Sequence, residues 1–182
     1  MSMPALTPDL EALLATRRDG HGMPRAFYQT ESLYELELAR IWHGGWLFAG
    51  FTFEVPKPGD YLTLDVGGTS LLVMRDDAGE IRAFHNVCRH RGTLLCRADN
   101  GHVRAIVCPY HSWTYSRQGD LVNCHGMHDV DKSKLGLKPV ASEVVAGLIY
   151  VSLAAEPPSF APLREEFEPA ALHVTTFSLV VK

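Results

Sequence analysis

Apolar residues in the first 45 positions recur every three or four residues, which is the spacing of one face of an α-helix. They predict a short helix over residues 10–17 and a second helix over residues 31–43. Ser32 and Glu35 have the spacing of a capping box at the start of the second helix. The chain is therefore expected to begin with a helical segment, residues 1–45.

After residue 45 the pattern changes to short apolar runs separated by turn residues, which is typical of antiparallel strands. Gly67 and Gly68 predict a two-residue hairpin turn between two such runs. The predicted strands cover residues 46–55, 61–66, 70–75, 80–85, 104–108, 113–116, 121–123 and 147–153. The pattern predicts a mainly β fold with flanking helices, whose central domain, residues 46–155, is an antiparallel sandwich or small barrel.

The last part of the chain has a different character. Pro162 is a favourable first residue for a helix predicted over residues 163–167. Residues 175–181 form an apolar, β-branched run that predicts a strand in need of a partner. We therefore expect the natural protein to continue, with residues 156–182 forming a linker and the first part of a truncated catalytic domain.

Composition excludes several function classes. The 182 residues are 46% hydrophobic and 21% charged, as in an ordinary globular protein, and the net charge of −4 argues against a nucleic-acid partner. No apolar run approaches the roughly 20 residues of a membrane span. The chain does not start with the basic and apolar regions of a signal peptide, so the expected compartment is the cytoplasm.

Two short segments carry the strongest chemical signal. Cys88 and His90 lie in the first segment, and Cys108 and His111 lie in the second, with seventeen residues between His90 and Cys108. In a Rieske [2Fe–2S] cluster two cysteines hold one iron and two histidines hold the other. These four residues are therefore the predicted cofactor-binding and metal ligands, and the predicted activity is one-electron transfer.

The ligand types also predict a redox range. Two neutral imidazoles in place of two thiolates remove two negative charges from the oxidised cluster, so adding an electron becomes easier. Rieske potentials fall roughly between −150 and +300 mV, against about −400 mV for plant-type ferredoxins. Trp113 and Tyr115 are expected to shield the site from water. Trp113 has no oxygen to donate a hydrogen bond to a bridging sulfide, so we expect a potential below about +150 mV.

A zinc site is the alternative reading of the same four residues. Zinc sites with two cysteines and two histidines usually pair like ligands, whereas each pair here is mixed. An absorption spectrum separates the two, because an iron–sulfur protein is brown and a zinc protein is colourless. The other cysteines, Cys96 and Cys124, are expected to be buried small apolar residues.

The ligand segments resemble those of the α subunits of Rieske non-haem iron oxygenases, which hydroxylate aromatic rings or demethylate quaternary ammonium compounds. The resemblance rests on Cys88–Gly92 and Cys108–Tyr115 and covers nearly all of residues 27–153. It extends outward through the segments at 46–50, 56–61 and 136–140. The family implies a Rieske domain followed by a larger domain with a mononuclear Fe(II) in a two-His, one-carboxylate triad.

This sequence departs from the family in one respect. After His128 the only histidine is His173, so the mononuclear Fe(II) is expected only in a missing domain, and no catalytic residue is predicted here. The resemblance implies a Rieske oxygenase whose electron donor is a reductase or ferredoxin. It also implies a homotrimer in the full-length form, in which His111 faces the neighbouring subunit.

The substrate implied by the resemblance is a quaternary ammonium compound, with an aromatic ring as the alternative. A free-standing Rieske ferredoxin is the competing function. Ferredoxins of that type begin almost directly with the sheet, so the helical segment before residue 46 and the tail after residue 153 speak against it.

Overall fold

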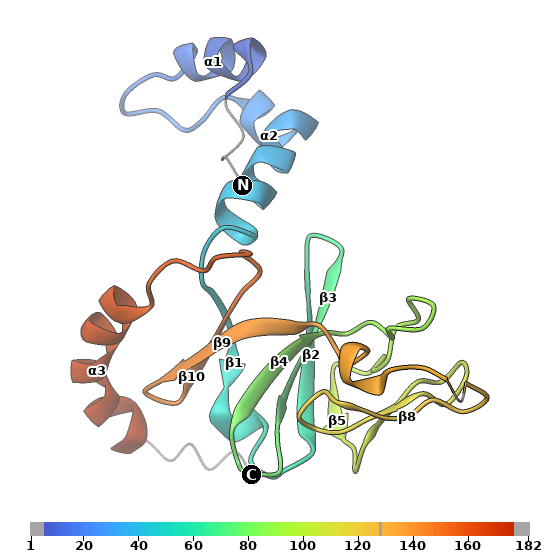
Figure 1. Ribbon diagram of the computed structural model, residues 1–182. Helices are drawn as coiled ribbons and strands as arrows, with labels where there is room; N and C mark the ends of the chain where they lie inside the picture. The colour runs from blue at the N-terminus through green and yellow to red at the C-terminus, as the bar shows by residue number, and fades with distance from the viewer. Residues whose placement is uncertain (1–5, 128, 177–182) are drawn as a thin grey trace.

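Ten strands organise the residues that the computed structural model describes, 6–127 and 129–176. Seven form one antiparallel sheet in the order β1-β10-β9-β4-β3-β2-β5, which curls into a half-barrel (Figure 1). Its strands are β1 (Leu47–Phe51), β2 (Asp60–Val66), β3 (Thr69–Arg75), β4 (Ile81–His85), β5 (Asn100–His102), β9 (Pro139–Val145) and β10 (Leu148–Ser152). The second sheet contains β6 (Ile106–Val107), β7 (Thr114–Tyr115) and β8 (Leu121–Asn123). The predicted mainly β, antiparallel fold is confirmed.

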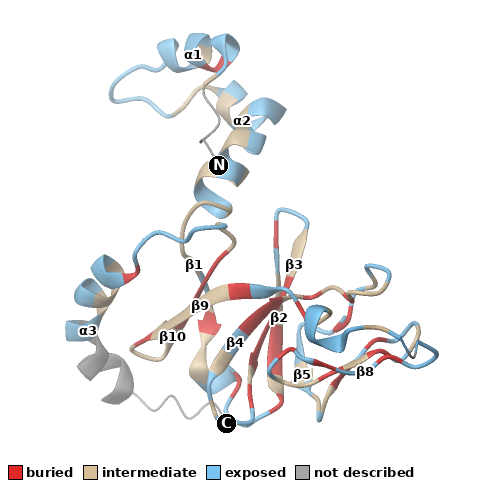
Figure 2. Ribbon diagram, in the orientation of Figure 1, coloured by how far each residue is buried: buried red, intermediate tan, exposed pale blue. Residues whose placement is uncertain are grey.

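Strand β3 lies between two hydrophobic cores. Leu71 and Val73 pack into the core of the large sheet, while Leu72 and Met74 pack into the core beneath the small sheet. Successive side chains of a strand point to opposite faces, so one strand serves both cores. All four side chains are fully buried, and Figure 2 shows buried residues concentrated in β2, β3 and β4.

The turn between β2 and β3 follows the prediction from Gly67 and Gly68. Val66 pairs with Thr69, and both glycines have positive φ angles, 57° and 81°. These backbone angles are easily adopted by glycine and suit a two-residue hairpin.

Two strands, β5 and β9, lie outside the predicted set. β9 begins with Pro139 and has polar residues in its middle, so its apolar pattern is weak. Its place is fixed by its partners, because Ala83 of β4 pairs with Val140 and β10 pairs along its length. Predicted strand 46–55 also ends early, at Phe51, where a 3₁₀ turn over Thr52–Glu54 begins.

The N-terminal segment forms the predicted helices with altered ends. α1 (Pro8–Ala15) precedes a 3₁₀ turn (Arg25–Tyr28), and α2 (Glu31–Glu37) continues into a π-helical turn (Leu38–Trp42). The predicted capping box is wrong. Thr30 occupies the N-cap position, and its hydroxyl donates a hydrogen bond to the Ala26 carbonyl rather than accepting one from the helix. These elements form an arm that extends away from the sheet (Figure 1).

Helix α3 (Ala161–Thr176) is much longer than the helix predicted over 163–167. It packs beside β9 and β10, where Phe167 and the preceding Phe160 contact Tyr150, and Leu163 packs against the same cluster. The predicted strand 175–181 is wrong at its start, because residues 175 and 176 are helical, and the rest lies outside the described residues. None of the helices described is both long enough and apolar enough to cross a membrane.

Candidate iron–sulfur site

The first predicted ligand pair lies on a tight loop after β4. The Cys88 amide donates to the Thr93 carbonyl at 2.8 Å, and the Gly92 amide donates to the Cys88 carbonyl at 3.0 Å. Gly92 has a φ of 70°, a conformation that glycine adopts without a Cβ penalty. The loop closes between Val87 and Leu94, which form an isolated antiparallel bridge.

The second pair lies on a loop between β6 and β7 with the same backbone pattern. The Cys108 amide donates to the Trp113 carbonyl at 2.8 Å, and the Ser112 amide donates to the Cys108 carbonyl at 3.0 Å. The residue four positions after the cysteine again has positive φ, here Ser112 at 57°. A non-glycine residue in this conformation costs about 1–2 kcal/mol, so the loop is held by its surroundings. The sequence alone gives no sign of this strain.

Asn86 joins the two ends of the first loop. Its side-chain amide donates to the Cys96 carbonyl at 2.7 Å and to the Ser70 hydroxyl at 3.1 Å, while its carbonyl oxygen accepts from the Cys96 amide at 2.9 Å. The residue is fully buried. Its position beside the ligand loop predicts a supporting role, and its contacts show that it ties the loop to β3.

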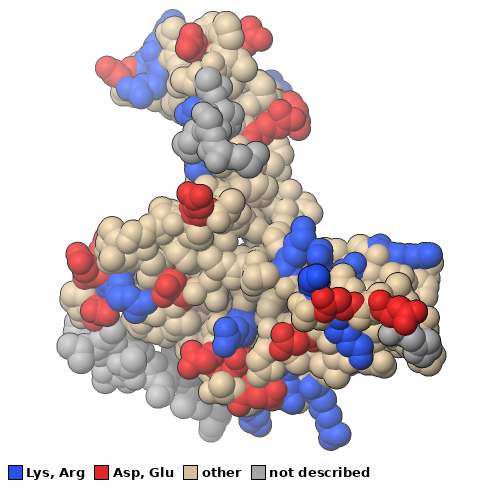
Figure 3. Space-filling model, viewed as in Figure 1, with Lys and Arg blue, Asp and Glu red and all other residues tan. Residues whose placement is uncertain are grey.

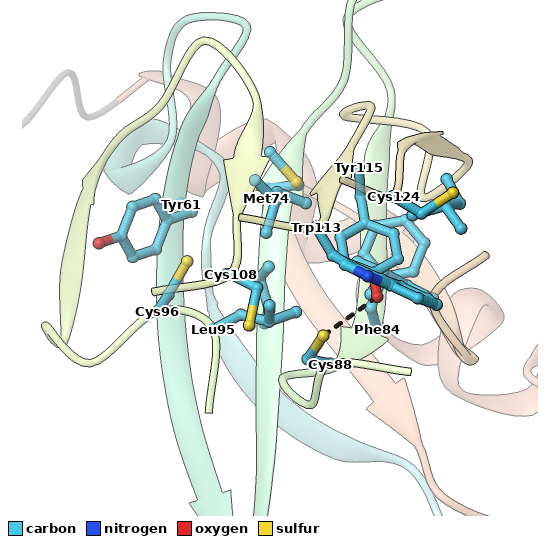
Figure 4. Close-up of a cluster of buried hydrophobic side chains, with 14 residues drawn as sticks. Tyr61, Met74, Phe84, Cys88, Leu95, Cys96, Cys108, Trp113, Tyr115 and Cys124 are labelled. Atoms are coloured by element: carbon cyan, nitrogen blue, oxygen red, sulfur yellow. Dashed lines mark hydrogen bonds between the residues drawn. The ribbon is translucent and has the colours of Figure 1, made fainter. Parts of the chain in front are cut away.

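The four predicted ligands divide into a buried pair and a surface pair. Cys88 and Cys108 are each 2% exposed and carry free thiols, and both belong to the core beneath the small sheet. Figure 4 shows them between the Cys96 and Tyr115 sides of that core. His90 and His111 are half-buried, with ring centroids 4.8 Å apart. The thiols thus lie inside and the imidazoles lie at the surface.

This arrangement suits a binuclear cluster. Nδ1 of His111 is buried and has no hydrogen-bond partner among the described residues, so a ring nitrogen is free to bind a metal. No group of three or more His, Cys, Asp or Glu gathers around a single point in the described part of the chain. A Rieske [2Fe–2S] cluster needs only two protein ligands on each iron, so its four ligands need not converge.

Trp113 and Tyr115 both shield the site. Trp113 is 2% exposed and stacks on His90 with centroids 4.8 Å apart and planes 6° apart. Tyr115 is fully buried, and its hydroxyl lies 3.3 Å from Sγ of Cys88 (Figure 4). The same hydroxyl accepts a hydrogen bond from the Arg89 amide at 3.0 Å. Its proton is then available to the Cys88 sulfur, a contact that the sequence does not indicate.

The surroundings shift several ionisation equilibria. Loss of solvent, with added repulsion from His111 and Arg91, lowers the pKa of His90, so its ring favours the neutral form that binds metals. Burial raises the pKa of Tyr115, which keeps its hydroxyl protonated. Burial also raises the pKa of Cys96 to about 11. Cys96 and Cys124 are buried free thiols, as expected.

Comparison with known proteins places the site within a known domain. Residues 45–134 match the family "Rieske [2Fe-2S] domain". The chain is 40% identical over 163 residues to the glycine betaine monooxygenase oxygenase subunit of Pseudomonas aeruginosa (strain UCBPP-PA14), an alignment covering 86% of this chain and 38% of that protein. It is 38% identical over 151 residues to the biphenyl 2,3-dioxygenase subunit alpha of Rhodococcus jostii (strain RHA1), covering 81% of this chain and 33% of that protein.

Solved structures give the same result. The quaternary ammonium Rieske monooxygenase CntA, in complex with an inhibitor, is similar with a TM-score of 0.73 and 27% identity, covering 84% of this chain and 43% of CntA. The chain spans about a third of the length of the curated relatives that it matches.

Proposed function

Residues 45–134 match the Rieske [2Fe-2S] domain family, and on that premise we propose that Cys88, His90, Cys108 and His111 hold a cluster that relays electrons within an oxygenase α subunit. The observation that carries this proposal is the pair of loops with one shared backbone pattern, each offering a buried thiol and a surface imidazole. A bound [2Fe–2S] cluster supplies one-electron chemistry. The protein residues hold the ligands in place and exclude water around the thiols.

The relay needs a donor and an acceptor. We propose a reductase or ferredoxin as the cytoplasmic donor, and a mononuclear Fe(II) held by a part of the α subunit outside this chain as the acceptor. The full-length subunit would act as a homotrimer, with His111 facing its neighbour. The support for an oxygenase rather than a free ferredoxin is that the similarity reaches into the residues before 46, since an alignment covering 86% of the chain cannot leave out all of them.

The substrate that we propose is a small quaternary ammonium compound, which the full-length enzyme would demethylate with O₂. The glycine betaine enzymes match at 40–44% identity over 81–86% of the chain, against 38% over 81% for the biphenyl enzyme. Formaldehyde release from glycine betaine by the full-length subunit and its reductase is the expected result. A dihydroxylated product from biphenyl, with glycine betaine untouched, would favour the aromatic alternative.

The first test addresses the cluster itself. The purified chain should contain two irons and two sulfides and give a rhombic Rieske EPR signal on reduction. His90→Ala and His111→Ala should each abolish that signal, because each removes a ligand from one iron. His21→Ala, on the exposed arm, is the matched control and should leave the signal intact. A colourless protein with bound zinc, or a surviving signal in both ligand variants, would show that the proposal is wrong.

A further inference from the structure

The charge of the chain is unevenly distributed around the cluster site. Residues 86–138, which include both ligand loops, contain eight Lys or Arg and four Asp or Glu. The rest of the chain contains nine Lys or Arg and seventeen Asp or Glu. Figure 3 shows Lys and Arg along the upper edge of the lobe that carries the ligand loops, with acidic side chains below them. A negatively charged protein thus has a positively charged lobe at its redox site.

Several of these cations have no partner among the residues that the structure describes. The charged groups of five side chains in this lobe make no ion pair or hydrogen bond to any described residue, in contrast to Arg82 and Arg164, which pair with acids. The five are Arg89, Arg91, Arg97, Arg104 and Lys138. All of them except Arg89, whose Nε is buried, are exposed, so their charge is available to a partner.

Two of the five lie beside an apolar hollow. Arg97 and Arg104 are exposed and line a hollow of about 600 Å³, together with Leu95, Val107 and Pro109. Val107 is 50% exposed. Leu95 and Cys96, which line the same hollow, lie on the Cys108 side of the core in Figure 4, away from Tyr115.

The hollow also lies close to a ligand along the chain. Val107 and Pro109 are the two neighbours of Cys108, so a molecule seated against them is one residue from a cluster thiol. Neither histidine of the imidazole pair lines the hollow.

We propose that the Arg97–Arg104 hollow is the docking surface for the electron donor, a small redox protein with a carboxylate-rich face. This inference rests on the proposed electron-transfer function and adds the surface and the charge of the partner. Apolar contact at the floor gives close approach, while the cations steer an acidic partner and raise its association rate. The carrier is oxidised by one electron and the cluster site is reduced by one, with no bond made or broken.

The experiment uses the full 182-residue chain and an acidic plant-type [2Fe–2S] ferredoxin as the probe. Binding is measured by titration calorimetry at several salt concentrations, and cluster reduction by the prereduced probe is followed by stopped-flow absorbance. Arg104→Glu should weaken binding about fivefold or more, and the Arg97→Glu/Arg104→Glu double variant about tenfold or more. The double variant should also lose most of the salt dependence, because the steering charges are reversed.

Arg18→Glu, in the loop after α1, is the matched control, since Arg18 is exposed and makes no ion pair to a described residue. It should change binding less than twofold. The rhombic EPR signal and iron content of every variant should match those of the wild type, so a failure of docking is separable from a loss of the cluster.

Three results would overturn the docking proposal while leaving the cluster assignment intact. The first is a double variant that binds the ferredoxin no worse than Arg18→Glu. The second is a loss of binding confined to Lys138→Glu, which would place docking at a different hollow, lined by Lys138 and Arg89. The third is a change of oligomeric state in the double variant by sedimentation, which would make the hollow an interface between copies of the chain.

Discussion

The hydroxyl of Tyr115 is placed to donate a hydrogen bond to the sulfur of Cys88. Tyr115 Oη lies 3.3 Å from Cys88 Sγ and accepts from the Arg89 amide, so its geometry favours donation to the sulfur. A hydrogen bond to a thiolate ligand stabilises the more negative, reduced state of an iron–sulfur site. The low potential expected from Trp113 alone is therefore partly offset by a residue two positions later.

Tyr115→Phe should lower the midpoint potential, because it removes that donor with little change in shape. A preference of about 1 kcal/mol for the reduced state corresponds to roughly 40 mV for one electron. Protein-film voltammetry measures the shift. Tyr150→Phe, which removes a hydroxyl elsewhere in the core, should leave the potential unchanged. A potential that rises in Tyr115→Phe, or a wild-type value above about +150 mV, would contradict this account.

The first ligand loop and the turn between β3 and β4 are each held by the side-chain hydrogen bonds of one buried polar residue. At the start of the first ligand loop Asn86 makes three side-chain hydrogen bonds, two with Cys96 at the far end of the loop and one with Ser70 of β3. In the turn between β3 and β4 the Asp76 carboxylate accepts from the Ala78 and Glu80 amides and from Arg82 Nε at 2.9 Å each. Losing either residue leaves buried partners unsatisfied.

Asn86→Ala should lower the free energy of unfolding by about 2–4 kcal/mol, since it strips partners from the Cys96 amide and carbonyl inside the core. The loss should also lower the iron content, because the first loop is no longer tied at its ends. Urea unfolding and iron analysis are the measurements. Asn123→Ala, at an exposed position of β8, is the matched control. Equal free energies of unfolding for the two variants would show that the Asn86 hydrogen bonds do not stabilise the fold.

Asp76 should make stability depend on acidity. Burial alone would raise its pKa, but the hydrogen bonds from Arg82, Glu80 and Ala78 hold the pKa of this carboxyl below its usual range. The ionised form is thus favoured by folding, and its stabilisation is present above pH 4 and lost as the pH falls through the lowered pKa. Asp76→Asn should be less stable than wild type by about 1–3 kcal/mol at pH 7, with the difference shrinking below about pH 4. A pH-independent difference in urea unfolding would refute this.

At the scale of the whole molecule, the N-terminal arm contains far fewer buried residues than the large sheet. Leu10 is the only fully buried residue described among positions 6–45, whereas every strand of the large sheet except β5 contributes buried residues. The arm meets the sheet at the β2–β3 turn, where the Leu38 side chain lies over Gly67 and His43 lies 3.4 Å from the Val66 carbonyl. We propose that residues 46–155 fold as a unit without it.

A variant that begins at Gly45 should keep the EPR signal and midpoint potential, because the ligand loops rest on β3 and β4. Its melting temperature should fall by no more than about 5 °C, as expected for a loss near 1 kcal/mol. Calorimetry and EPR measure both. Loss of the cluster, or failure to melt cooperatively, would place the domain boundary within the arm.

The features that the sequence predicts correctly are those set by residues close together in the chain. Gly67 and Gly68 specify their own turn, and most strand positions follow from apolar runs a few residues long. β9 pairs with β4, more than fifty residues earlier, and its polar middle hides it from a local pattern. The Tyr115–Cys88 contact spans 27 residues, and the strain at Ser112 depends on the matching geometry of the loop. Features fixed by distant contacts therefore require the structure.

The repeated turn in the two ligand loops bears on how fast electrons move. Each loop is closed by the same pair of backbone hydrogen bonds, and the loops rest on a core shared with β3, which is buried on both faces. Atoms held this closely shift little when the charge of the site changes by one. Since an electron crosses most easily when its surroundings rearrange least, we expect a small reorganisation energy, and transfer limited by how often partners meet.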